Sequence, residues 1–343
     1  MKYRNLGPTD LKISEFGFGC IPIIRLSTEE AIHVLRYALD KGINFFDTAN
    51  GYHDSEKKIG LAFKHNRHDV VLATKSTMRD AVGITEHIEN SLRMLQTDYL
   101  DLFQFHQVSK QEEWEEILGP KGAMEAVLKA QEQGKIRHVG ITTHSNSMAI
   151  QFIKAELFDT IMVAFNFIEK SPQDEILGLT QKYNIGFLAM KPFAGGVLDN
   201  ATLAFKFLRQ FPTAVPLPGF DSTAQIDEIL DLYKEPNIVT KEDFTLMEAY
   251  LKDLGSEFCR RCEYCQPCPN GVEITTAMSY PIMVKRMDVA ATIAHAEKAM
   301  KSFRKCTFCY GCLNECPYKL LIPDILAKNY KMYLQHKNEL RNN

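Results

Sequence analysis

Residues 44–52, NFFDTANGY, indicate the fold of the N-terminal part of the chain, because a short apolar run there ends on the carboxylate of Asp47 and a loop follows at once. The same form recurs at residues 70–75, VVLATK, which end on Lys75, and at residues 100–106, LDLFQFH, which end on His106. Short apolar runs of this length are typical of strands buried on both faces. The pattern therefore predicts parallel strands whose carboxyl ends carry ionisable side chains.

Outward from these runs, apolar segments alternate with amphipathic helical stretches from residue 15 to about residue 232, the pattern of successive βα units. Eight strands are expected, at Glu15–Cys20, Asn44–Thr48, Val70–Lys75, Leu100–His106, His138–His144, Thr160–Asn166, Gly186–Pro192 and Ala214–Phe220. Eight such units predict an α/β fold, a (β/α)8 TIM barrel, with residues 1–14 as a hairpin across its floor. A doubly wound sheet is the alternative, but no Gly-x-Gly-x-x-Gly follows the first strand.

Helix signals agree with this reading. Ser27 and Glu30 have the spacing of a capping box, and Gly42 is placed to end the helix that they begin. The next strand is expected two residues later.

Composition excludes several classes of function. The 343 residues are 45% hydrophobic and 24% charged with a net charge of -3, which predicts globular domains and no nucleic-acid partner. The N-terminus lacks the pattern of a signal peptide, and no run of 18 apolar residues occurs. We expect a soluble cytoplasmic protein with no membrane partner.

The composition changes after residue 235. We expect the barrel over residues 1–235, a helical linker over residues 236–255 and a small, mainly helical domain over residues 256–343. Helices are predicted at residues 241–254 and 289–302. A core this small is marginal, so bound metal could supply much of its folding energy.

Cysteines identify the chemistry of that second domain, since eight of the nine lie between residues 259 and 316. They form two runs with short, regular spacing: Cys259, Cys262, Cys265 and Cys268, then Cys306, Cys309, Cys312 and Cys316. The second run has the spacing of bacterial ferredoxins, in which the fourth cysteine binds the other cluster. The spacing therefore predicts a ferredoxin-like domain with two [4Fe-4S] clusters.

The ferredoxin rule pairs Cys268 with the second run and Cys316 with the first. Zinc remains an alternative, although it usually takes two separated Cys-x2-Cys pairs. The ninth cysteine, Cys20, is expected to be a small buried apolar residue.

Four side chains near the strand ends suggest an active site. Taken singly, Asp47 could cap a helix, Lys75 could be a solvated rim charge, His106 a core histidine and Tyr52 surface packing. Together they suit proton transfer to a carbonyl oxygen, because a lysine cation favours the tyrosinate and lowers a tyrosine pKa that is ordinarily ~10. The aspartate would hold the lysine, and the histidine would orient the substrate oxygen.

These segments resemble the aldo-keto reductase superfamily: FFDTANGYHDSE resembles its Asp-Thr-Ala…Tyr…Ser-Glu segment, LATK its lysine strand, QFH its histidine strand and GKIRHVGITTH its fifth strand. The resemblance covers residues 1–230. It implies Tyr52 as general acid–base supported by Asp47, Lys75 and His106, a nicotinamide cofactor, NAD(P)H, and a small carbonyl or alcohol substrate. The C-terminal run resembles the ferredoxin-type extension of one subgroup of that superfamily.

The resemblance also identifies residues expected to contact the cofactor: Thr142, Thr143, Asn166, Met190, Lys191, Gly219, Asp221 and Gln225. Several depart from the family. Thr142 and Thr143 replace its Ser-Asn pair, Met162 its glutamine, and Met190 its stacking aromatic ring. Gly219 and Gln225 replace the lysine and arginine that bind the adenosine 2′-phosphate, which argues against a strong NADP preference.

Two hypotheses account for both halves of the chain. In the first, electrons pass between nicotinamide, substrate and clusters, and the clusters connect to an electron-carrier protein. Nicotinamide releases two electrons as hydride whereas each cluster accepts one, so this route calls for a mediator such as a flavin, which no residue indicates. In the second, the clusters form a structural or partner-docking module beside an ordinary carbonyl reductase.

Overall fold

The protein is described as a computed structural model that covers residues 1–255, 257–261, 265–286, 288–316 and 318–342. The chain divides into two compact units, Met1–Phe244 and Thr245–Asn343. Their boundary falls within helix α10, Lys241–Leu254. The domain limits expected at residues 235 and 255 stay a prediction.

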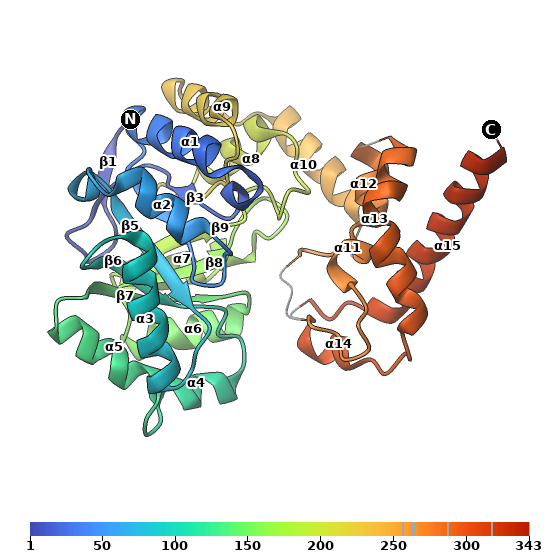
Figure 1. Ribbon diagram of the computed structural model, residues 1–343. Helices are drawn as coiled ribbons and strands as arrows, with labels where there is room; N and C mark the ends of the chain where they lie inside the picture. The colour runs from blue at the N-terminus through green and yellow to red at the C-terminus, as the bar shows by residue number, and fades with distance from the viewer. Residues whose placement is uncertain (256, 262–264, 287, 317, 343) are drawn as a thin grey trace. The chain divides into compact units, whose positions relative to one another are not determined.

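The first unit is built on eight parallel strands that are neighbours in chain order (Figure 1). They are β3 Phe18–Gly19, β4 Phe45–Asp47, β5 Val71–Ser76, β6 Leu100–Phe105, β7 Ile136–Thr143, β8 Thr160–Ala164, β9 Gly186–Met190 and β10 Ala214–Pro216. Backbone hydrogen bonds then join the segment around β3 to the end of β10: Gly17 N donates to Pro216 O at 2.9 Å and Gly19 N to Pro218 O at 2.8 Å. The α/β fold of a (β/α)8 barrel is confirmed.

The first strand differs from the prediction, because only Phe18–Gly19 of the expected Glu15–Cys20 is extended and paired. The segment facing it contains Pro216 and Pro218, which have no backbone N–H and can only accept hydrogen bonds. A continuous ladder cannot form at this closure. The other seven expected strands are present with ends shifted by a few residues.

Helices follow the strands on the outside of the first unit (Figure 1). They are α1 Thr28–Asp40, α2 Ser55–Phe63, α3 Ala81–Leu95, α4 Gln111–Leu118, α5 Ala123–Glu132, α6 Asn146–Ala155, α7 Ile176–Lys182, α8 Ala201–Leu208 and α9 Thr223–Lys234. The predicted capping box is confirmed at α1, where the Ser27 side chain accepts from Glu30 N and Ser27 N donates to the Glu30 carboxylate.

A hairpin closes the floor of the barrel, as predicted. Strands β1 Tyr3–Asn5 and β2 Lys12–Ser14 pair antiparallel, and Leu6, Leu11 and Ile13 pack into the apolar bottom of the strands. Gly7 has a φ of 55°, and a Cβ there would lie 2.2 Å from Gly186 N. The hairpin can reach this depth only with glycine at that position.

The second unit is helical in the part of the chain that is described. Its helices beyond α10 are α11 Ile274–Met278, α12 Tyr280–Arg286, α13 Val289–Ser302, α14 Gly311–Glu315 and α15 Ile322–Asn342. Helices α11, α13 and α15 share a core that includes Ala277, Ala296 and Leu326. The predicted helices at residues 241–254 and 289–302 are confirmed as α10 and α13. Among the described residues no helix is both long and apolar enough to cross a membrane.

Candidate functional site

Three neighbouring strands bring the predicted polar side chains to the carboxyl end of the barrel. Asp47 is the last residue of β4, Lys75 lies near the end of β5, and His106 follows β6 directly. The register pairs Asp47 with Ala73 and Lys75 with Gln104. Because parallel strands end at the same edge, residues far apart in the sequence meet there.

Asp47 and Lys75 form a buried ion pair. Lys75 Nζ donates to Asp47 Oδ1 and to the carbonyl oxygen of Thr48, both at 2.5 Å, and the two side chains are 7% and 2% exposed. Burial opposes the charge of Lys75, but the charges of Asp47 and Tyr52 outweigh it and raise the pKa of Lys75. Lys75 is therefore a fixed cation at the barrel mouth.

Tyr52 lies between this cation and His106. It belongs to the loop after β4, is half-buried, and its ring centroid is 5.3 Å from Lys75 Nζ. The Tyr52 and His106 rings meet edge to face with centroids 5.8 Å apart. Burial, followed by the charges of Lys75 and Arg79, holds the pKa of His106 well below its usual range, so its imidazole is neutral at neutral pH.

Sequence reasoning assigned no role to two buried polar residues beside this group. Gln104 Nε2 donates to Asp47 Oδ2 at 2.9 Å. Glu56, at the start of α2, accepts from Thr74 Oγ1 at 2.6 Å, and burial raises the pKa of its carboxyl. In the sequence, Gln104 could have been singled out because it is the one amide in the predicted buried strand LDLFQFH, residues 100–106.

The expected nicotinamide contacts lie at the ends of β7, β8 and β9. Thr142 Oγ1 accepts from Gln107 N at 2.8 Å, and Thr143 Oγ1 accepts from Ser145 N at 3.0 Å. Asn166 is fully buried. Its Nδ2 donates to Lys191 O at 3.0 Å, and its Oδ1 accepts two backbone N–H bonds at 2.9 Å. Thr143 Oγ1 also lies 3.2 Å from Ser109 Oγ. The Asn166 amide is engaged on both sides, by its own loop through Oδ1 and by the loop after β9 through Nδ2.

Met190 and Lys191 complete this part of the rim. Met190 ends β9 and is half-buried, and Lys191 has a φ of 57°. A thioether at the end of β9 offers a soft apolar surface to a ring, with less geometric preference than an aromatic side chain.

The loop after β10 carries the carboxylate of Asp221, and Gly219 and Gln225 stand where the resemblance led us to expect a lysine and an arginine. Gly219 bridges to Gly19, and Asp221 accepts from Gln225 Nε2 at 2.9 Å and pairs with Arg25 at 3.2 Å. Arg25 is thereby paired with an acid. These residues suit a ribose hydroxyl, which can donate to a carboxylate, better than a phosphate.

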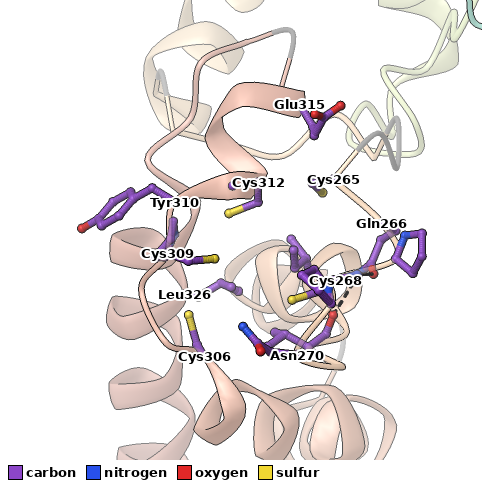
Figure 2. Close-up of a pocket in the computed structure, with 16 residues that line it drawn as sticks. Cys265, Gln266, Cys268, Asn270, Cys306, Cys309, Tyr310, Cys312, Glu315 and Leu326 are labelled. Atoms are coloured by element: carbon purple, nitrogen blue, oxygen red, sulfur yellow. Dashed lines mark hydrogen bonds between the residues drawn. The ribbon is translucent and has the colours of Figure 1, made fainter.

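One cavity of about 280 Å³ in the second unit is lined by the four predicted ligands of one cluster, Cys268, Cys306, Cys309 and Cys312, and also by Cys265. Figure 2 shows their sulfur atoms directed toward a shared space. Burial, and then the neighbouring thiols Cys306, Cys309 and Cys268, raise the pKa of Cys312 to about 11.

The remaining cysteines are less completely described. Cys265 lines the same cavity, Cys316 is buried in the helical core, Cys259 is half-buried and Cys262 lies outside the described residues. Cys20 is fully buried, as expected. Within the described ranges, no three or more His, Cys, Asp and Glu side chains form a group that could hold a metal ion.

Comparison with known proteins gives a consistent result for the barrel. Residues 16–204 match the aldo/keto reductase family. The chain is 33% identical over 219 residues to the oxidoreductase YqkF of Bacillus subtilis (59% of this chain, 68% of that protein). It is 30% identical over 220 residues to the aldo-keto reductase YhdN of the same organism (58% of this chain, 64% of that protein).

A solved structure agrees with these matches. The holo form of the aldo-keto reductase AKR11C1 from Bacillus halodurans superposes with a TM-score of 0.62 at 26% identity, covering 73% of this chain and 96% of that chain.

Proposed function

This chain belongs to the aldo/keto reductase family of oxidoreductases, and on that premise we propose that its barrel interconverts a small carbonyl and an alcohol with Tyr52 as general acid–base. The observation that carries the proposal is the position of Tyr52, whose ring lies 5.3 Å from the Lys75 ammonium and 5.8 Å from the His106 ring. A cation and a neutral imidazole beside a phenol are the groups that proton transfer to a carbonyl oxygen requires.

The proton step follows from the charges. The Lys75 cation favours the tyrosinate, which makes the Tyr52 hydroxyl a better acid. A bound reduced nicotinamide would supply hydride to the carbonyl carbon. The Tyr52 hydroxyl donates its proton to the carbonyl oxygen while His106, kept neutral, donates a hydrogen bond to the same oxygen. In the reverse direction the tyrosinate accepts the alcohol proton.

For the cofactor, NADH is the better fit. Thr142, Thr143, Met190 and Lys191 border the barrel mouth where the nicotinamide half would lie, and Asn166 supports them through Lys191 O. Asp221, held by Gln225 next to Gly219, would accept from a ribose hydroxyl and repel a 2′-phosphate.

For the second unit, the proposal is an iron-sulfur domain with two [4Fe-4S] clusters. The support is one cavity lined by all four members of one proposed ligand set, Cys268, Cys306, Cys309 and Cys312 (Figure 2). Cys265, assigned to the other set, lines it as well. Each thiolate of such a cluster binds a different iron, so the ligands stand farther apart than those of a single ion. The other proposed set is Cys259, Cys262, Cys265 and Cys316.

These clusters would exchange single electrons with a carrier protein outside the chain. Nicotinamide transfers two electrons at once whereas a cluster accepts one at a time. Exchange between them inside the protein therefore calls for a mediator, and flavins are one chemical class that can serve. Clusters that keep one oxidation state throughout turnover would instead belong to a structural or docking module.

Anaerobic reconstitution with iron and sulfide tests both halves. We expect about eight iron atoms per chain and the absorbance and electron paramagnetic resonance of four-iron clusters. NADH and NADPH, each with a panel of small aldehydes and ketones, should support carbonyl reduction that Tyr52→Phe abolishes without changing the iron content. Zinc in place of iron, or reduction that survives Tyr52→Phe, would overturn the corresponding half of the proposal.

A further inference from the structure

Gln104 is a fully buried amide in the interior of the barrel. It lies on β6 two residues before His106, and the sheet register places it opposite Lys75 on one side and Gly140 on the other. A Cβ on Gly140 would lie 2.2 Å from Thr160 Oγ1 and 3.2 Å from Gln104 Cγ, so glycine on the neighbouring strand leaves room for both side chains.

The Gln104 amide donates a hydrogen bond to the carboxylate oxygen of Asp47 that Lys75 does not contact. Lys75 Nζ takes Oδ1, and Gln104 Nε2 donates to Oδ2 at 2.9 Å. Donors from two different strands therefore fix the plane of one buried carboxylate. Burial raises the pKa of Asp47, and its bonds to Lys75 and Gln104 oppose that rise.

Packing alone does not explain an amide at this position. Gln104 Oε1 is buried and accepts no hydrogen bond from any described residue. An unpaired buried acceptor is unfavourable, whereas methionine would fill a similar volume without a polar atom. Buried groups that lower stability in this way are expected where a site requires them.

We propose that Gln104 is a positioning residue for the active site: its amide holds the Asp47 carboxylate in the orientation that directs Lys75 toward Tyr52. The inference rests on the proposed function of the barrel, because it gives Gln104 a role in the same proton transfer. Gln104 acts through Asp47 and Lys75 and does not contact substrate.

Gln104→Met is the test variant, and Gln133→Met, at an exposed position after α5, is the matched control. Removal of a hydrogen bond to a buried carboxylate should lower kcat by roughly tenfold to a hundredfold with KM nearly unchanged. Without a well-placed Lys75, the Tyr52 pKa should rise, so the pH profile of alcohol oxidation should move to higher pH. Thermal stability should fall because Asp47 Oδ2 loses a buried donor, and removal of the unpaired Gln104 Oε1 should offset part of that fall.

Gln104→Glu supplies a conservative comparison. A protonated glutamic acid can donate to Asp47 Oδ2, so this variant should retain more activity at low pH and lose it as a second buried carboxylate ionises beside Asp47.

A measurement without turnover separates this inference from the proposed function. The pKa of Tyr52 can be followed from tyrosinate absorbance as the difference between each protein and its Tyr52→Phe counterpart. A higher Tyr52 pKa in Gln104→Met supports the inference even if no carbonyl is reduced, a result that would overturn only the proposed function. An active native protein whose pH profile and Tyr52 pKa are unchanged by Gln104→Met would overturn the inference and leave the proposed function standing.

Discussion

Replacement of Lys75 by methionine should destabilise the barrel strongly, because it leaves the buried carboxylate of Asp47 without its cation partner. Asp47 and Lys75 are 7% and 2% exposed, so solvent cannot replace the lost cation. Removal of one partner of such a buried pair costs about 3–5 kcal/mol. With a urea m-value of about 2–3 kcal/mol per M, the unfolding midpoint should fall by about 1–2.5 M.

Intrinsic fluorescence is a suitable assay, because the chain contains one tryptophan, Trp114, and it is buried in α4 of the barrel. The signal therefore reports unfolding of the first unit alone. Lys58→Met is the matched control: Lys58 is also buried, but its acid partner Asp54 is 47% exposed and stays solvated when the lysine is removed. The other groups that lose a bond are the uncharged carbonyls of Ile23 and Leu26, which cost less to leave unpaired than a buried carboxylate. Lys58→Met should cost clearly less than Lys75→Met.

The pH dependence of Lys75→Met has a definite sign. An unpaired buried Asp47 has a folded-state pKa above its unfolded value of about 3.9, so the variant should be least destabilised below that pH and progressively more so above it. The double variant Asp47→Asn, Lys75→Met should recover part of the loss. A midpoint that falls no further than in Lys58→Met, or a loss independent of pH, would refute the reasoning.

Three further predictions concern His138, Cys309 and Asp221. His138 donates toward Asp159 and Asp10, which raises its pKa, so its stabilisation should be complete below about pH 6.5 and disappear as pH rises through the folded value. Urea midpoints of the native protein and His138→Asn, followed by Trp114 fluorescence, should differ at pH 5.5 and converge at alkaline pH; a constant difference would contradict this. Cys309→Ser should lose one cluster's iron while Cys20→Ala keeps it all, by iron analysis of reconstituted protein; equal losses would disprove the assignment. Asp221→Ser should lower the KM ratio of NADPH to NADH by about fivefold to tenfold, since one exposed like charge near a phosphate contributes about 1 kcal/mol; an unchanged ratio would count against the assigned 2′-position.

Much of the fold could be predicted because its determinants are local. The capping box at Ser27, the apolar run before Asp47 and the helical pattern of residues 289–302 each depend on neighbours a few positions away. The meeting of Asp47, Lys75 and His106 also followed from sequence, because the carboxyl ends of parallel strands share one edge whatever the register.

Other features depend on partners distant in the chain. Gln104 and Asp47 are 57 positions apart, and only the register between β4, β5 and β6 brings the amide to the carboxylate. The short first strand likewise results from prolines on a segment about 200 residues away, which offer no N–H to the closing ladder.

The sequence by itself thus determined the order of strands and helices, the ionisable group at the barrel rim and the two cysteine runs, because periodicity, caps and spacing are properties of short segments. Tertiary structure alone decided which polar groups are already engaged. The Asn166 amide bonds backbone groups of its own loop and of the loop after β9, whereas the Gln104 amide bonds the carboxylate of Asp47. Hydrogen bonding is directional and short-ranged, so a buried polar side chain acquires its partner only when packing fixes strand register and depth.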